Sequence, residues 1–291
     1  MKPIRRPRIG SAIYVLPNLI TTGNLFFGFF SIVKSLRGEF HWAASALLLA
    51  AVFDVLDGRV ARLTKTNSEF GVQYDSLCDL VSFGLAPAFL MYQYGLNSFG
   101  RIGWIACFLF LACGALRLAR FNVQSSIGKA SGDFTGLPIP MAAAVIATFV
   151  AFMTDLDANQ GGELWIQQIA HEFLSPLPVR QGIMLALTPM VAFAMVSNIT
   201  YRSHKTLRIT AIKPFRLLVL FVIVTALAAW QPELVGFFVA LTYFLSGPFE
   251  YALGWKKAVE DEEIFAPQED DDSVMDPIDE DDHNPNSKPK S

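Results

Sequence analysis

The sequence predicts an all-α membrane protein, a polytopic helical bundle of about eight transmembrane helices. Hydrophobic residues make up 53% of the 291 residues, charged residues make up only 17%, and the mean hydropathy is +0.39. Soluble domains of this length are less apolar and more highly charged. The apolar residues also gather into eight runs. A run of roughly 20 such residues crosses a hydrocarbon core about 30 Å thick as one helix.

The predicted spans follow one another along the chain with short polar connections. Together they form a predicted transmembrane domain over residues 17–258. In chain order the eight spans run from Pro17 to Leu36, Trp42 to Leu63, Tyr74 to Leu96, Ile102 to Arg120, Leu137 to Asp155, Ile183 to Ile199, Leu217 to Trp230 and Leu234 to Leu253.

Charge is distributed unevenly along the chain. Thirteen of the 26 carboxylates lie between Glu260 and Asp282, while only two of the 23 Lys and Arg residues follow Glu260. A segment so acidic and so poor in aromatic residues buries too little apolar surface to fold. Residues 259–291 are therefore predicted to form a disordered acidic tail.

The basic residues predict the orientation of the spans. If residues 1–16 form a basic cytoplasmic N-terminus, eight spans return the C-terminus to the cytoplasm. The Lys and Arg residues then divide into 19 inside and 4 outside, which is the positive-inside pattern. We therefore expect a multi-pass protein of the cell (inner) membrane with both termini in the cytoplasm, the lipid bilayer as its surroundings and no nucleic-acid partner.

Four aspartates lie inside the predicted membrane region, where an ionised carboxylate costs at least a few kcal/mol. Asp54 and Asp57 lie near the end of the second span, and Asp75 and Asp79 lie near the start of the third. A short turn between these spans is expected to bring both pairs into one cavity at the cytoplasmic face. Such carboxylates repel one another unless cations lie between them, and oxygen ligands favour Mg²⁺ or Mn²⁺.

The residues beside these aspartates fit a phosphate ligand. Gly58, Ala61 and Arg62 share a helix face with Asp54 and Asp57 by their spacing. Two small residues there allow a bulky group to approach the backbone, and Arg62 can donate paired hydrogen bonds to a phosphate. A single Asp–Arg pair at a span end is more often structural, so the inference depends on the whole set occurring in register.

The stretch from Asp54 to Asp79 reads D-x2-D-G-x2-A-R-x8-G-x3-D-x3-D. This resembles the signature of the CDP-alcohol phosphatidyltransferase family at all of its fixed positions. The resemblance implies a catalytic core of six helices, two metal ions per site and release of CMP. It also implies that Asp54, Asp57 and Asp75 are metal ligands, and that Asp79 is both a ligand and the general base.

The same resemblance implies a site for the CDP part of the lipid. Gly58, Arg62 and Ser68 would contact it, and Ala61 and Gly71 belong to the same signature. A weaker family pattern places two residues of the first span near the pyrophosphate. The predicted CDP-lipid residues are therefore Asn18, Thr21, Gly58, Ala61, Arg62, Ser68 and Gly71.

The expected chemistry is an in-line displacement. Two divalent ions on the diphosphate would neutralise the charge that builds up on the departing CMP. The carboxylate of Asp79 would take the proton of the acceptor hydroxyl as the new bond forms. No covalent intermediate is needed.

A second block of residues points to the acceptor. The segments 114–122 and 134–140 read GALRLARFN and FTGLPIP, and both are similar to the phosphatidylserine synthase branch of the family. That resemblance implies CDP-diacylglycerol as donor and L-serine as acceptor. Arg117 and Arg120 are candidates for binding the serine carboxylate or the lipid diphosphate, although positive-inside anchoring explains them equally well. Asn122 is a further candidate for the acceptor pocket.

Two alternatives remain open. The first keeps the chemistry but changes the acceptor to glycerol 3-phosphate, an inositol phosphate or choline. A phosphorylated acceptor would need extra cations, for which Arg117, Arg120 and Lys129 are the candidates. The second is a cation-coupled transporter, but the acids lie near one membrane face and their segment has no inverted repeat. A homodimer is expected from the resemblance alone.

Overall fold

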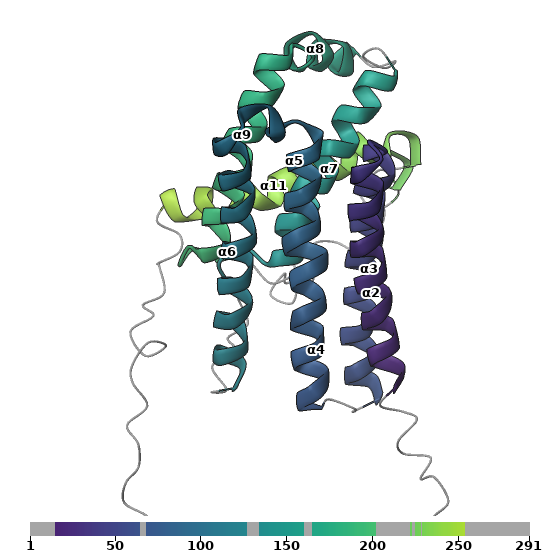
Figure 1. Cartoon of the computed structure of the whole chain (residues 1–291), viewed down its shortest axis with the longest axis vertical. Coiled ribbons are helices and arrows are strands. Elements are labelled where there is room, and N and C mark those ends of the chain that lie inside the picture. Colours follow the sequence, from purple (N-terminus) through teal and green to yellow (C-terminus); the bar gives the residue numbers. More distant parts are fainter. Residues whose placement is uncertain are drawn as a thin grey trace, which may run out of the picture. The chain divides into compact units, whose positions relative to one another are not determined.

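The structure is a computed structural model (Figure 1), and it describes residues 15–64, 68–126, 134–159, 165–201, 222, 225–227 and 229–253. The chain divides into two compact units, Met1–Glu260 and Asp261–Ser291, and every described residue belongs to the first. Most of the predicted N-terminus, most of the seventh span, the acidic tail and Lys129 therefore lie outside the described residues.

The first two helices form an antiparallel pair. Helix α2 (Val15–Leu36) is followed, after a short turn, by α3 (Phe40–Thr64), and the two lie side by side in Figure 1. An ion pair between Lys34 and Glu39 closes the turn between them. Helix α2 also packs against the next helix, α4 (Glu69–Asp79). These contacts make α2 the common neighbour of the two helices that carry the four aspartates.

The third predicted span is a continuous helical run of three pieces. It begins at Glu69 rather than at Tyr74, and α4 passes into the π-helix η1 (Leu80–Leu85) and then into α5 (Ala86–Tyr94). Pro87 lies in the first turn of α5. A proline has no N–H to donate to the preceding turn, and a local π-turn accommodates such a break in the hydrogen-bond ladder.

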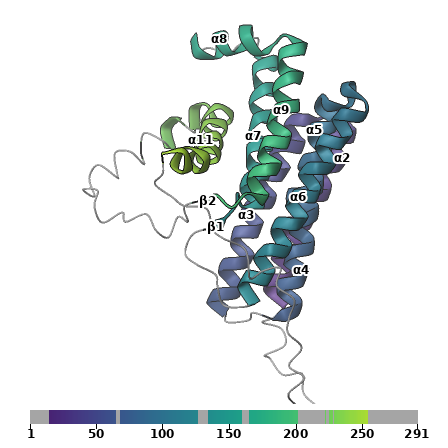
Figure 2. The same ribbon diagram turned by 90° about the vertical axis from the view of Figure 1, so that its left-hand side faces the viewer.

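The remaining long helices surround one central helix. After the short 3₁₀ turn η2 (Leu96–Phe99) come α6 (Arg101–Ser126), α7 (Ile139–Ala158) and α9 (Leu177–Val196). The span of α7 is 72% buried, against at most 44% for the other span-length helices. Helix α7 packs against α3, and α6 packs against α9 (Figure 2).

A short β pair fixes the start of α7 to the end of α9. Strand β1 (Phe134–Thr135) pairs antiparallel with β2 (Thr200–Tyr201), and Gly136 N donates to Ile199 O at 2.9 Å. Gly136 has a φ of 76°, and a side chain there would collide with the carbonyl of Met195. Only glycine fits both requirements without strain.

The last described helix, α11 (Pro232–Ala252), packs against α7 and against β2. Tyr201 is fully buried at this junction, and its hydroxyl donates to Phe244 O at 3.4 Å. Burial raises the pKa of the Tyr201 phenol, so the hydroxyl keeps its proton for this bond. The short helix α8 (Trp165–Leu174) joins α7 to α9 (Figure 2).

The prediction of an all-α membrane protein is confirmed. In the described residues five helices, α2, α6, α7, α9 and α11, are long and apolar enough to cross a membrane. The second and third predicted spans correspond to α3 and to the run from α4 to α5. Large apolar side chains such as Phe26, Phe29 and Phe108 are about 60% exposed, as expected for side chains that face lipid. The count of eight spans stays a prediction.

Candidate active site

Three of the predicted metal ligands meet in space. One carboxylate oxygen each from Asp54, Asp57 and Asp75 lies within 4.8 Å of the others. The first two lie on α3 and the third lies on α4. Both helices pack more extensively on α2 than on each other. The carboxylates therefore approach one another from two helices that both pack on α2.

These carboxylates are not satisfied by the protein. Asp57 Oδ2 and Asp75 Oδ1 are buried and have no hydrogen-bond partner among the described residues. A buried polar group without a partner is costly, and buried charges are normally paired or bound to metal. Three carboxylates at this spacing, two of them with an unpartnered buried oxygen, form a donor set suited to a hard divalent cation. The residues present therefore fit a metal ion.

Asp79 occupies a different position from the other three. It is 8% exposed, and its Oδ1 accepts a hydrogen bond from Asn24 Nδ2 at 3.0 Å. Its charge interacts with that of Asp54. Asp79 is the last residue of α4, directly before η1. The fourth aspartate is thus at the edge of the carboxylate cluster, with one oxygen held by a neighbouring amide.

One arginine faces this acidic cluster. Arg117 on α6 is only 7% exposed, its charge interacts with Asp54 and Asp79, and its guanidinium lies 5.2 Å from the ring centre of Phe121. It has no hydrogen-bond partner among the described residues. Because one arginine cannot neutralise four carboxylates, the site keeps room for further positive charge. The free guanidinium can also bind an anionic group of a ligand.

Space is open beside Gly58. A Cβ added to Gly58 would meet no atom within 4 Å, so packing inside the protein does not require glycine at this position. Arg62, one turn further along α3, is exposed. Ala61 is half-buried on the same stretch of helix. This part of α3 therefore leaves a surface next to the carboxylates that a ligand can approach.

The predicted CDP-lipid residues of α2 and α4 lie close together. Ser68 Oγ accepts from Gly71 N at 3.0 Å, which caps the start of α4. A Cβ on Gly71 would lie 3.5 Å from Asn18 Oδ1. Thr21 is 4% exposed and lies beside Asp57. The structure thus gathers these residues around the carboxylate cluster, while their contacts with a lipid stay predictions.

The two weaker acceptor candidates, Arg120 and Asn122, form hydrogen bonds with residues at the end of α9 and on α4. Arg120 donates from Nη2 to Val196 O at 3.0 Å and from Nη1 to Asn198 Oδ1 at 3.2 Å, at the end of α9. Asn122 Nδ2 donates to Ser76 Oγ at 2.9 Å and links α6 to α4. Both contacts have a structural use, and a role in acceptor binding stays a prediction for each.

Asn24 is the main site residue that the sequence motifs do not indicate. A pattern in α2 does point to it, because small and polar residues recur there at alternating spacings of four and three. In a membrane helix such a stripe faces the protein. All six of its members are buried: Pro17, Thr21, Asn24, Gly28, Ser31 and Ser35.

Comparison with known proteins agrees with this geometry. The family model described as CDP-alcohol phosphatidyltransferase matches residues 14–179. The matched region includes the whole carboxylate cluster, Asn24 and Arg117. It ends before β2 and before α11, which packs against α7 and β2.

Curated relatives cover between 45% and 67% of the chain. The CDP-diacylglycerol–serine O-phosphatidyltransferase of Helicobacter pylori is 34% identical over 67% of this chain and 75% of its own length. The archaetidylserine synthase of Methanothermobacter thermautotrophicus is 42% identical over 51% of this chain and 64% of its own. The Saccharomyces cerevisiae CDP-diacylglycerol–serine O-phosphatidyltransferase is 43% identical over 45% of this chain and 51% of its own.

Proposed function

This chain belongs to the CDP-alcohol phosphatidyltransferase family, and we propose that it transfers a phosphatidyl group from CDP-diacylglycerol to the hydroxyl of L-serine. The products are phosphatidylserine and CMP. The observation that carries the proposal is the meeting of Asp54, Asp57 and Asp75 within 4.8 Å, with buried oxygens that lack partners. The names of the relatives from three domains of life support serine as the acceptor.

Two divalent ions, Mg²⁺ or Mn²⁺, are part of the proposal. Asp54, Asp57, Asp75 and Asp79 would hold them. Bound there, the ions would supply positive charge for the diphosphate of the lipid and for the CMP that leaves. The four carboxylates repel one another when no cation is present, so a cation that binds between them is strongly favoured.

Asp79 is proposed as the general base. It differs from the other aspartates because Asn24 occupies one of its oxygens, which leaves the second available for the acceptor hydroxyl. A positioned carboxylate of this kind contributes roughly 10²–10⁴-fold to a reaction rate. The proton of the acceptor hydroxyl would pass to Asp79 as the acceptor oxygen bonds to phosphorus and the bond from phosphorus to the departing CMP breaks.

The open surface of α3 is the proposed site for the CDP part. The free space over Gly58 lets a nucleotide approach the backbone, and the exposed Arg62 can pair with a phosphate. Asn18, Thr21, Ala61, Ser68 and Gly71 complete this region. The acyl chains would extend into the surrounding lipid.

Arg117 is proposed as the anchor of the serine carboxylate. Its buried guanidinium faces Asp79 and has no protein hydrogen-bond partner among the described residues. An acceptor carboxylate bound there would place the acceptor hydroxyl beside the base. Arg120 and Asn122 would support this side of the pocket by holding α6 against α9 and α4.

The proposal also includes the setting of the enzyme. The positive-inside pattern supports cytoplasmic termini and an active site at the cytoplasmic face of the cell (inner) membrane. A homodimer is part of the proposal, and the molecular mass of the protein in detergent, measured by light scattering, tests it.

The reaction is tested with purified protein, CDP-diacylglycerol, Mn²⁺ and L-serine. We expect release of CMP with serine, and loss of that release in Asp79→Asn with the fold retained. Release with glycerol 3-phosphate but not with serine would replace the acceptor. Cation flux into proteoliposomes without CMP release would replace the enzyme with a transporter.

The acceptor anchor is tested with serinol, which is serine with its carboxylate replaced by a hydroxymethyl group. Wild-type protein should prefer serine over serinol in kcat/KM by about 10–100-fold, because a charge-assisted pair contributes roughly 1.5–3 kcal/mol. In Arg117→Gln that preference should nearly disappear. A preference that survives the substitution would remove Arg117 from the acceptor site.

A further inference from the structure

Asn24 links α2 to both sides of the point where α4 becomes η1. It is fully buried, and its Nδ2 donates to Asp79 Oδ1 at 3.0 Å. Its backbone carbonyl accepts a hydrogen bond from Ser82 Oγ at 3.0 Å. One residue of α2 thus contacts the last side chain of α4 and a side chain of the following π-helix.

Close packing between α2 and η1 holds Asn24 at the level of Asp79 and Ser82. Gly28, one turn further along α2, lies directly against Ser82, and a Cβ on Gly28 would collide with that residue. The backbones of α2 and η1 therefore approach each other as closely as a glycine allows. This close packing holds the backbone of Asn24 next to Asp79 and Ser82.

The side-chain amide of Asn24 donates a hydrogen bond to the carboxylate of Asp79, but the amide oxygen itself has no partner among the described residues. This oxygen, Oδ1, is buried. An unsatisfied buried acceptor costs about 1–3 kcal/mol. Turning the amide around would place Oδ1 against Asp79 and lose the one side-chain bond that the residue makes. The arrangement is therefore explained by the need to donate an N–H to Asp79.

We propose that Asn24 is a positioning residue: its amide N–H holds one oxygen of Asp79 so that the other oxygen stays directed at the acceptor hydroxyl. The inference rests on the proposed function, in which Asp79 takes the proton of that hydroxyl. Reaction requires the two oxygens to be about 3 Å apart and aligned. Asp79 closes α4 directly before a π-helix, where side chains lose the regular spacing of an α-helix, so an external support from α2 fixes its direction.

The test compares Asn24→Leu, which keeps the branching of the side chain but cannot donate, with wild-type protein. We expect kcat for CMP release to fall about 10–100-fold, since misplacing a reacting group by about 1 Å costs roughly 10²-fold. KM for CDP-diacylglycerol and for serine should change by less than about twofold. The Mn²⁺ concentration that gives half-maximal activity should also stay within that range, because Asn24 contacts only Asp79 among the four proposed ligands, and the cluster of Asp54, Asp57 and Asp75 is untouched.

Ser31→Ala is the matched control. Ser31 lies two turns further along the same buried stripe of α2 and, like Asn24, carries a buried oxygen without a partner among the described residues. It has no part in the site, so kcat should stay within about twofold of wild type. Ser82→Ala removes the second link to Asn24 and should lower kcat less than Asn24→Leu does.

Three results would overturn the inference. One is a kcat for Asn24→Leu within about threefold of the wild-type value. Another is a loss that lies mainly in KM or in the Mn²⁺ requirement, which would make Asn24 a binding residue. The third is an equal loss in Ser31→Ala. A wild-type protein that releases no CMP with serine would instead contradict the proposed function, and the two failures are thereby distinguished.

Discussion

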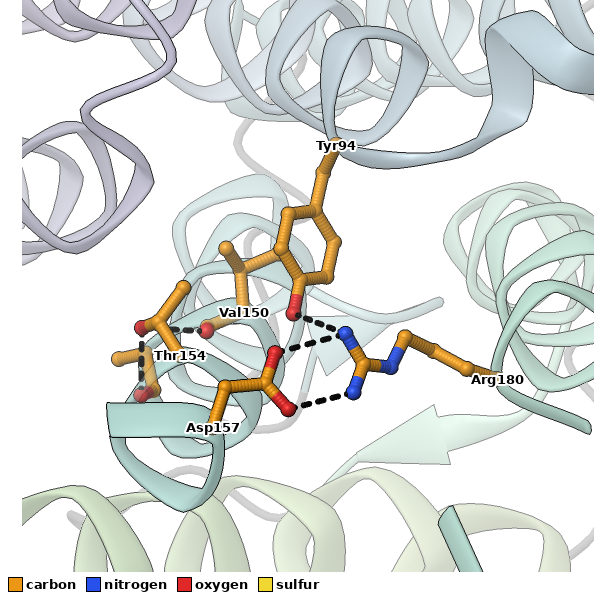
Figure 3. A network of polar contacts seen from close by, with 6 residues as sticks. Tyr94, Val150, Thr154, Asp157 and Arg180 are labelled. Atoms are coloured by element: carbon orange, nitrogen blue, oxygen red, sulfur yellow. Dashed lines mark hydrogen bonds and ion pairs between the residues drawn. The ribbon is translucent and has the colours of Figure 1, made fainter. Parts of the chain in front are cut away.

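Two clusters of charged side chains lie near opposite ends of α3 and differ in how their charges are matched. Near the end of α3, three aspartates meet and two of their buried oxygens have no partner. Near its start, Phe40 packs against Tyr94, whose hydroxyl belongs to a second cluster with Asp157 and Arg180 (Figure 3). There Arg180 donates to Asp157 through both Nη atoms, at 2.6 and 2.8 Å.

The comparison distinguishes an ion pair that stabilises the fold from carboxylates that are available to bind a ligand. The cluster of Tyr94, Asp157 and Arg180 joins α5, α7 and α9 through one bidentate ion pair. Its acid and base match in number and geometry, so its charges are balanced within the protein, although Arg180 Nε is buried without a hydrogen-bond partner among the described residues. The aspartate cluster has like charges in excess, which bound cations would balance. Four predictions test this difference.

The largest expected effect is the loss of activity in Asp75→Asn. Removing one of three clustered ligands should lower CMP release by roughly 10³-fold or more, because metal-assisted charge stabilisation supplies several kcal/mol. The apo protein should unfold at the same or a higher temperature, since one repulsive charge is gone. Activity assays and thermal unfolding in EDTA measure both effects. A large fall in the apo unfolding temperature would mean that the cluster is structural.

Metal ions should stabilise the wild-type protein. A ligand that binds only the folded state adds about 2.7 kcal/mol of stability at a concentration of 100 times its Kd. Thermal unfolding with and without Mn²⁺ should therefore show a clear upward shift for wild type and for Asp157→Asn, but little shift for Asp57→Asn. Equal shifts in all three proteins would indicate that Mn²⁺ binds elsewhere.

Asp157→Asn should affect stability without affecting the reaction. The substitution leaves Arg180, whose side chain is only 13% exposed, without its counter-charge. The Asp157 side chain is 42% exposed, so solvent screens the pair and we expect a loss of only about 1 kcal/mol. The unfolding temperature should fall while CMP release per folded molecule stays unchanged. A large loss of activity at full stability would contradict the division between the two clusters.

The smallest change of structure, one added methyl group, tests the surface beside the aspartates. Gly58→Ala and Gly182→Ala each place a Cβ where no atom lies within 4 Å, the first beside the aspartates and the second on α9 near Arg180. Neither should disturb folding. Gly58→Ala should raise the KM for CDP-diacylglycerol about tenfold, roughly the effect of 1.4 kcal/mol, whereas Gly182→Ala should leave it unchanged. Equal kinetics of the two variants would show that no ligand approaches Gly58.

The sequence predicted the aspartate cluster because its evidence is local. Asp54 and Asp57 lie one turn apart on one helix and Asp75 and Asp79 lie one turn apart on the next, and both pairs interrupt apolar spans. Helical periodicity is sufficient to place each pair on one face. The all-α fold follows from composition and span length for the same reason.

What the sequence did not predict depends on packing between distant segments. Arg117 and Arg120 look alike in the sequence, yet the first faces the aspartates and the second holds the end of α9. Asn24 meets Asp79 across 55 positions of the chain. The π-helix before Pro87 has no periodic signal, and its change of spacing is visible only in the folded chain.

The central claim is that the aspartates gather in order to hold divalent ions on a nucleotide diphosphate. Electron paramagnetic resonance of Mn²⁺ with the purified protein, titrated with and without CDP, tests it most directly. We predict that wild type and Asp157→Asn bind Mn²⁺ and that CDP tightens this binding, while Asp57→Asn and Asp75→Asn bind weakly under either condition. Mn²⁺ binding that is equal in all four proteins and indifferent to CDP would contradict the account.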